Sequence, residues 1–372
     1  MVRMAEQVTV HRPTLASKVG AALSHPVVFS LVFAFALGWL IVYLTGRDPG
    51  FAYSEMLNGA VTGSGLRNTL GRAVPIIGMA LAVSVAFRSG VINLGGEGQM
   101  VVGGLAGALV AIYTPGPGEL VIPLAMVAGG VAGAAWAMLP AFGQTRLRLP
   151  ILITSLLLNY VARAITGYLV RFHFLDDSVT LTSTRQVPEI ARMPRMPIFG
   201  GVSLSLALVI VLVAVAWVVY GRTVSGYETQ MAGLNGRFAR YGGIQVERQT
   251  VGVMVVAGTI GGIIGTHMII GDAYRFIDGE LVVSGLAWTG LLVALLAANH
   301  PVMILVAGLL FSGLQIGGLA MQRNADVSWR LSQVLQALVI VAVASRLTFG
   351  WFKRQRAGPS ESELEPAAVG EV

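Results

Sequence analysis

The sequence predicts an all-α polytopic membrane protein, and three observations carry that prediction. Hydrophobic residues make up 55% of the 372 residues and charged residues only 12%, about half the charged share of an ordinary soluble domain. The mean hydropathy is +0.74. The apolar residues also fall in long runs, and about 20 consecutive apolar residues cross a bilayer as one helix. No polar stretch between these runs is long enough to hold a large soluble domain.

Ten apolar runs are candidate spans, and ten spans place both ends of the chain on one side of the membrane. The runs lie near residues 27–45, 70–87, 91–113, 120–142, 151–170, 201–220, 250–271, 281–298, 301–321 and 331–352. They predict a transmembrane domain over 27–352, after a polar cytoplasmic segment at 1–26. The first run is too long for the apolar part of a cleavable signal peptide, so we expect it to remain as a span. Residues 357–372 are expected to form a disordered cytoplasmic tail.

The distribution of lysine and arginine predicts that both termini are cytoplasmic. In that orientation the inner segments carry more of these residues than the outer ones, as the positive-inside rule requires. The inner segments are 1–26, 88–90, 143–150, 221–249, 299–300 and 353–372. The net charge of +7 comes almost wholly from arginines scattered singly over the loops. Such scatter does not indicate a nucleic-acid site, and we expect no nucleic-acid partner.

Glycines four residues apart recur within the predicted spans, and such pairs let helix backbones approach closely in a membrane. The pairs are Gly103/Gly107, Gly129/Gly133, Gly258/Gly262, Gly261/Gly265 and Gly313/Gly317. Two glycine-rich segments, "GVINLGGEGQMVVGGLAGAL" and "GGIQVERQTVGVMVVAGTIGG", also echo each other about 150 residues apart. An internal repeat, as found in many transporters, and chance similarity both fit this echo.

The motifs of common soluble enzymes are missing. No Gly-Lys pair exists for a phosphate-binding loop, and Val101 stands where a dinucleotide fingerprint needs its third glycine. The chain has no cysteine, which excludes disulfides and thiolate metal sites. The five histidines lack metal-ligand spacing. We therefore expect no catalytic site, no metal and no cofactor.

The stretch "SGVINLGGEGQM" (89–100) places Asn93, Glu97 and Gln99 at the inner end of the third span. Ionisable groups at membrane depth are costly and usually face a cavity or a partner. The glycines suit a broken helix, and broken helices line substrate paths in many transporters. A helix N-terminus also welcomes a carboxylate at the aqueous interface. Glu97 is therefore either a path residue or a helix cap.

Two further polar side chains lie inside predicted spans. Asn159 falls near the middle of the fifth span, where it either lines a path or bridges two helices. Gln315 in the ninth span is a second candidate for a path. Arg163, in the fifth span, is expected to extend its guanidinium toward the outer interface.

The longest cytoplasmic loop, 222–249, contains "MAGLNGRFARYGGI" (231–244), which predicts one short amphipathic helix. Leu234, Phe238 and Tyr241 fall at i, i+4 and i+7, and Arg237 and Arg240 flank that stripe. An apolar stripe on a cytoplasmic loop favours docking to a partner protein or to membrane lipid.

The sequence resembles the permease subunits of ABC importers that serve branched-chain amino acids, simple sugars and nucleosides. The resemblance covers essentially residues 27–352. It rests on "FRSGVINLGGEGQM" (87–100), "ILITSLLLNY" (151–160), "GLNGRFARYGGI" (233–244) and "GLAWTGLLVALLAANHP" (285–301). The glutamate in the first motif and the "NHP" ending are most similar to the nucleoside and simple-sugar branch.

This resemblance implies about ten helices in a bacterial plasma (inner) membrane and import by alternating access. It implies three kinds of partner: ATP-binding subunits on the cytoplasmic face, a second related permease and an external substrate-binding protein. Segment 231–244 matches the segment that docks into the ATPase. The coupling residues implied are Gly233, Leu234, Asn235, Arg237, Phe238, Arg240, Tyr241 and Gly243. The segment Asn235-Gly236-Arg237-Phe238 departs from the Asn-Pro/Glu-x-Ala common in relatives.

Three other functions remain open from the residues alone. A secondary transporter would use Glu97 as its proton or ion site and would need no docking loop. A permease for branched-chain amino acids would share the same architecture. A membrane-embedded enzyme is disfavoured because no catalytic pair is evident.

Overall fold

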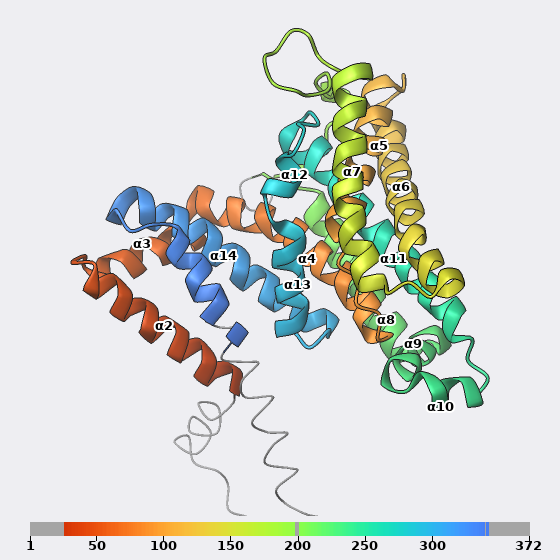
Figure 1. Cartoon of the computed structure of the whole chain (residues 1–372). Helices are drawn as coiled ribbons and strands as arrows, with labels where there is room; N and C mark the ends of the chain where they lie inside the picture. The colour runs from red at the N-terminus through yellow and green to blue at the C-terminus, as the bar shows by residue number, and fades with distance from the viewer. Residues whose placement is uncertain (1–25, 198–200, 339, 342–372) are drawn as a thin grey trace, which may run out of the picture.

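The computed structural model describes residues 26–197, 201–338 and 340–341, and most of these residues are helical. Figure 1 shows the arrangement of the helices in space. The longer helices are α2 (Pro26–Leu44), α3 (Pro49–Val61), α4 (Gly63–Arg88), α5 (Gly96–Tyr113), α6 (Gly118–Leu147), α7 (Ile151–His173), α8 (Ser205–Arg222), α9 (Val224–Leu234), α11 (Val246–His267), α13 (Leu286–Leu296) and α14 (Pro301–Ala325). The shorter elements are η1 (Glu189–Ala191), β1 (Arg195–Met196), β2 (Val202–Ser203), α10 (Gly236–Tyr241), η3 (Met268–Ala273) and α12 (Glu280–Val283).

Among the described residues, seven helices are long and apolar enough to cross a membrane. They are α4, α5, α6, α7, α8, α11 continued by η3, and α14. The prediction of an all-α polytopic membrane protein is thereby confirmed. The predicted eighth span is broken into α12 and α13 at Gly285, whose φ of +61° places it in the left-handed region. Residues 339 and 342–352 of the predicted tenth span, and the terminal segments 1–25 and 357–372, lie outside the described residues. The span number and the sidedness stay predictions.

Helix α3 was not among the predicted spans, because its polar residues interrupt the apolar pattern. Asp48 caps its N-terminus by accepting from the amide of Gly50 at 2.8 Å, and Pro49 occupies the first helical position. The helix packs on α14 at very short range: a Cβ at Gly59 would lie only 2.1 Å from Cβ of Ala320. Helix α3 therefore belongs to the bundle although it is only 13 residues long.

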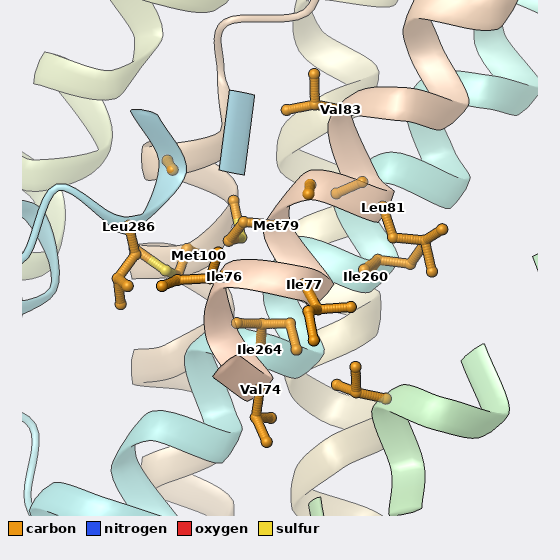
Figure 2. Packing of buried hydrophobic residues seen from close by; sticks show 14 of the residues in the cluster. Val74, Ile76, Ile77, Met79, Leu81, Val83, Met100, Ile260, Ile264 and Leu286 are labelled. Atoms are coloured by element: carbon orange, nitrogen blue, oxygen red, sulfur yellow. The ribbon is translucent and has the colours of Figure 1, made fainter. Parts of the chain in front are cut away.

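Helix α4 forms the centre of the bundle. Every residue from Ala73 to Ala86 is buried, as expected for a helix that is apolar on all sides. Figure 2 shows side chains of α4 packed among Met100 of α5, Ile264 of α11 and Leu286 of α13. The outer helices differ: only 17% of the apolar window of α8 and 28% of that of α7 is buried. Helix α4 thus connects the surrounding helices to one another.

The glycine pairs bring three helices into backbone contact, as predicted. A Cβ at Gly103 of α5 would lie 2.2 Å from Cα of Gly262 of α11. A Cβ at Gly262 would lie 2.0 Å from the carbonyl oxygen of Gly129 of α6. No side chain fits at these positions, so α5, α6 and α11 pack as one rigid unit.

The connections gather at two ends of the bundle (Figure 1). The connection from α7 to α8, with η1 and the β1–β2 pair, lies at one end beside η3 and α12; we call this the loop end. Helices α9 and α10 lie at the opposite end, near the turn from α6 to α7; we call this the tip end. The α7–α8 connection and the η3–α12 segment, which share a predicted side, therefore lie at one end, and the α6–α7 turn and α9–α10, which share the other, lie at the opposite end.

Candidate functional site

The stretch 89–100 forms a junction between α4 and α5. Gly90 turns the chain with φ of +75°, and α5 does not begin until Gly96. Within the junction, the side chain of Asn93 accepts a hydrogen bond from the amide of Gly95 at 2.9 Å. The side-chain amides of Asn93 and Gln99 lie 3.3–3.4 Å apart. Both side chains are buried, so the junction holds a polar cluster inside the protein.

Asn159 of α7 joins this cluster from another helix. Its Nδ2 donates to the carbonyl oxygen of Leu94 at 2.9 Å, and its Oδ1 accepts from the amide of Gly98 at 2.8 Å. Gly98 belongs to the first turn of α5, where backbone amides have no partner within the helix. Ser155, also on α7, accepts from the amide of Leu94 at 3.1 Å. Asn159 therefore caps α5 and ties it to α7, which is the helix-bridging alternative.

Glu97 lies in the first turn of α5 and is only partly buried. It lines a narrow cavity of about 10 Å³ together with Trp288 of α13, which is room for about one water molecule. Its carboxylate also lies near the positive end of the helix dipole. The placement favours the helix-cap alternative, because the cavity is too small for a solute.

Gln315 lies apart from the junction. Its Oε1 accepts from Nε of Arg72 on α4 at 3.0 Å. Arg72 lines a cavity of about 420 Å³ between α4, β2, η3, α12 and α14. Other charged side chains on this cavity are Arg67, Arg195, Asp272 and Glu280. Sequence reasoning missed the cavity because its walls come from distant segments; its one local signal is an arginine inside the apolar pattern of α4.

A buried histidine lies next to this charged cavity. Nδ1 of His267 is 2.5 Å from Oγ of Ser205, and Nε2 of His267 is 3.7 Å from Oδ2 of Asp272. Ser205 and His267 are almost wholly buried. No solute reaches such a hydroxyl, so these contacts fasten the start of α8 to the end of α11 and make no hydrolytic centre.

The segment 231–244 does not form one helix, so that prediction is wrong. Helix α9 ends at Leu234, and α10 begins at Gly236. Asn235 separates them with φ −156° and ψ 96°, and its Oδ1 accepts from the amides of Arg237 and Phe238, both at 3.1 Å. Asparagine favours such a cap over a helix interior because its short side chain hydrogen-bonds nearby backbone amides.

Helices α9 and α10 nevertheless expose large apolar side chains at the tip end of the bundle. Leu234 is 73% exposed, Phe238 66% and Tyr241 93%. Arg240 is held in an ion pair with Glu247 at 2.6 Å. Among the described residues no carboxylate forms such a pair with Arg237. Gly243, with φ of +85°, turns the chain after α10. We call this surface of α9 and α10 the tip.

The tip packs directly on the junction. A Cβ at Gly233 of α9 would lie only 2.2 Å from the carbonyl oxygen of Arg88, the last residue of α4. A Cβ at Gly90 would lie 3.3 Å from Cα of Gly233. The predicted coupling segment and the junction, which are far apart in sequence, therefore meet through two glycines.

Comparison with known proteins gives consistent matches over most of the chain. Residues 65–344 match the family model described as "Branched-chain amino acid transport system / permease component". The glucose ABC transporter permease protein TsgB13 of Haloferax volcanii is 31% identical over 342 residues, covering 89% of each chain. The guanosine ABC transporter permease protein NupP of Bacillus subtilis is 29% identical over 350 residues, covering 90% of this chain and 99% of NupP. The nucleoside ABC transporter permease protein NupB of Lactococcus lactis is 28% identical over 325 residues, covering 85% of this chain and 89% of NupB.

Proposed function

The chain belongs to the branched-chain amino acid transport system permease component family, and on that premise we propose that it imports nucleosides or simple sugars as the permease subunit of an ATP-driven transporter. It is a multi-pass protein of the plasma membrane. The names of its relatives support a neutral, hydroxyl-bearing solute over an amino acid. ATP is hydrolysed by partner subunits, since the sequence holds no phosphate-binding loop.

The exposed tip is the observation that carries this proposal. A self-sufficient transporter has no use for Leu234, Phe238 and Tyr241 on an exposed surface, because exposed apolar patches mark interaction sites. This surface fits a groove on an ATP-binding subunit. Arg237, beside the apolar side chains, is available to pair with a carboxylate of that subunit. Membrane lipid is the competing partner of such a surface.

Helix α4 provides a physical route from the tip to the opposite end of the bundle. Its last residue, Arg88, contacts Gly233 of the tip, and Arg72 on the same helix lines the charged cavity. These two arginines are about 24 Å apart along a helix that rises 1.5 Å per residue. A displacement of α9 by the ATPase would therefore be transmitted to the cavity through one buried, close-packed helix.

In the proposed cycle an external binding protein delivers the solute at the loop end of the bundle, and a second permease completes the transporter. The charged cavity beside Arg72 and Gln315 receives hydroxyl groups by hydrogen bonds. Closure of this end and opening at the tip end then follow from the motion of α4. The buried junction holds α5 and α7 together while α4 moves.

Reconstitution in proteoliposomes tests the proposal. The chain is combined with the ATP-binding subunits, second permease and binding protein of its own organism, and uptake of radiolabelled guanosine, glucose and leucine is measured. We expect ATP-dependent uptake of guanosine or glucose. The control contains the same components with a hydrolysis-deficient ATPase. Uptake by this chain alone would identify a secondary transporter, and uptake of leucine only would identify an amino-acid permease.

A further inference from the structure

Two polar groups face each other at the wall of the charged cavity without a completed hydrogen bond. Asp272 lines the cavity, and its side chain is 51% exposed. In the described part of the chain, its one contact within ion-pairing range is with His267, whose Nε2 lies 3.7 Å from Oδ2 of Asp272. Nε2 of His267 is buried and has no hydrogen-bond partner there. A buried polar atom without a partner is costly, so its retention needs an explanation.

The direction of the hydrogen bonds at His267 follows from the groups around its ring. An ionised carboxylate only accepts, so Nε2 carries the proton in the tautomer that suits Asp272. Nδ1 is then the acceptor, and Oγ of Ser205, 2.5 Å away, donates to it. Oγ of Ser203 lies 3.0 Å from Oγ of Ser205 and donates in turn. Four side chains therefore form a row of donors that runs one way, from Ser203 to Asp272; we call these four residues the polar row.

Both ends of the polar row lie on the wall of the charged cavity. Ser203 of β2 and Asp272 of η3 line the cavity, whereas Ser205 and His267 between them are almost wholly buried. Hydrogen bonds in a row polarise and strengthen one another in a buried environment. The two buried side chains therefore connect two cavity-lining groups from separate segments of the chain.

The backbone that carries Asp272 is irregular. Segment η3 (Met268–Ala273) is a π-helix directly after α11, and Tyr274 follows it in the left-handed region with φ of +55°. Single π-helical turns within α-helices are rare and are frequent at functional sites. A shift of about 0.8 Å toward His267 would bring Oδ2 of Asp272 to the usual N–H···O distance of about 2.9 Å. The last bond of the polar row is therefore a small movement away from completion.

The described walls of the charged cavity suit the hydroxyl groups of a sugar. They carry the carboxylates of Asp272 and Glu280, several arginines and the hydroxyl of Ser203, and no aromatic side chain on which a base could stack. A carboxylate has two oxygens and accepts up to four hydrogen bonds. When Oδ2 of Asp272 accepts from His267, Oδ1 remains for the solute.

We propose that Asp272 selects for neighbouring hydroxyl groups of the solute, and that His267 is the positioning residue that holds the Asp272 carboxylate on the cavity wall. Solute binding draws Oδ2 of Asp272 onto Nε2 of His267, which completes the polar row. Glucose carries neighbouring hydroxyls on its ring, and guanosine carries them on its ribose. This inference rests on the proposed function, because it takes the charged cavity as the solute site.

Protection of an introduced cysteine tests the proposal without requiring uptake, because the chain has no cysteine of its own. Asn68→Cys places a thiol at an exposed position on the wall of the charged cavity. Its reaction rate with the cationic reagent MTSET is measured on the purified complex in detergent, at increasing concentrations of glucose or guanosine. The concentration that halves the rate gives an apparent affinity. Ser178→Cys, exposed in the α7–α8 connection, is the control that should react without protection.

Two substitutions of His267, each combined with Asn68→Cys, separate positioning from stability. His267→Asn keeps an acceptor in place of Nδ1, for Ser205, and loses the donor at Nε2. We expect its apparent affinity to fall about tenfold with an unchanged Tm. His267→Gln keeps the donor and loses the acceptor, so affinity should stay within about twofold while the Tm falls. Thr259→Val is the control, because the Thr259 hydroxyl bonds only within α11.

Selection by Asp272 is tested with deoxy analogues of the same solutes. In the Asn68→Cys protein, 2-deoxyglucose or 2′-deoxyguanosine should protect about tenfold more weakly than glucose or guanosine. Addition of Asp272→Asn should weaken protection by the parent solute and remove this difference.

Three results would overturn the proposal: no labelling or no protection of Asn68→Cys, equal affinities in the two His267 variants, or an undiminished preference in Asp272→Asn. Uptake by the unsubstituted complex is measured separately. Protection without ATP-dependent uptake would contradict the proposed function and leave the roles of Asp272 and His267 standing. Uptake without protection would contradict those roles alone.

Discussion

The junction and the tip lie against each other at one end of the bundle, yet the junction buries polar side chains while the tip exposes apolar ones. In the junction, Asn93, Gln99 and Asn159 are buried and hydrogen-bonded to one another or to backbone. In the tip, Leu234 and Phe238 project from the surface. A buried polar network that is satisfied within the chain fixes a structure. Exposed apolar side chains have no such partner within the chain, and the proposed function assigns those of the tip to a partner protein.

The most diagnostic motif of the sequence and the proposed docking surface are different parts of the molecule. The stretch 89–100 is the most characteristic part of the sequence, but Asn93 and Gln99 bond to one another, and its backbone is bonded to Ser155 and Asn159 of α7. The tip is less characteristic in sequence and exposes the larger apolar side chains. The contact between Gly90 and Gly233 is where the two regions meet, so each region can be disturbed separately or both together.

The largest effect is expected when the junction loses its cap. Asn159→Leu leaves the amide of Gly98 and the carbonyl of Leu94 without partners, and each unsatisfied buried group costs about 1–3 kcal/mol. We expect the free energy of unfolding to fall by roughly 2–6 kcal/mol in total, measured as a lower Tm of the purified protein. Thr154→Val is the control, because Thr154 bonds only within its own helix. Equal Tm values for the two variants would remove the bridging role.

The next largest effect is expected at the tip, without loss of stability. Phe238→Asp places a charge where the proposed function puts an apolar anchor for the ATPase, and such anchors contribute about 2 kcal/mol or more to an interface. Affinity for the ATP-binding subunit should fall about thirtyfold or more at 1.4 kcal/mol per decade, while the Tm stays unchanged. Val224→Asp is the control, because Val224 is 73% exposed and lies at the first residue of α9, away from Phe238 in the sequence. Unchanged affinity for Phe238→Asp would move the docking surface elsewhere.

Features that depend on local sequence could be predicted in both regions. Composition and run length predict the membrane class because lipid imposes them on each span separately. The late start of α5 was visible in the glycines before Glu97, because glycine carries a local conformational signal. The exposed state of Phe238 and Tyr241 follows from their place in a polar loop.

Contacts between residues far apart in the chain could not be predicted from the sequence. Asn159 and Gly98 are 61 positions apart, and Arg72 and Gln315 are 243 positions apart. Nothing in the local pattern of either residue identifies its partner, so the bridging role and the charged cavity needed the fold. The prediction of one helix over 231–244 was wrong for a different reason. Leu234, Phe238 and Tyr241 do have helical spacing, but Asn235 prefers a capping position, which divides the segment into two helices.

A single methyl group between the two regions is expected to have an intermediate effect. Gly233→Ala places a Cβ 2.2 Å from the carbonyl oxygen of Arg88, so α9 must move away from α4. Such overpacking costs about 1–3 kcal/mol. We expect ATP hydrolysis by the assembled complex to continue while guanosine or glucose uptake falls. The control is Gly236→Ala, whose Cβ would have a contact of 3.9 Å with Val246. If both variants keep the same ratio of uptake to hydrolysis, the Gly90–Gly233 contact does not transmit motion.

The smallest effect is expected at Glu97, which belongs to the junction but is only partly buried. Glu97→Gln keeps the shape of the side chain and removes its charge from the first turn of α5. A charge at a helix N-terminus contributes about 0.3–1 kcal/mol, so the Tm should fall slightly and uptake should stay within about twofold of the unsubstituted complex. Gln99→Glu, which buries a charge in the same cluster, should destabilise far more. Loss of uptake in Glu97→Gln with an unchanged Tm would reverse the assignment, because a residue that moves solute without stabilising the helix lines the path.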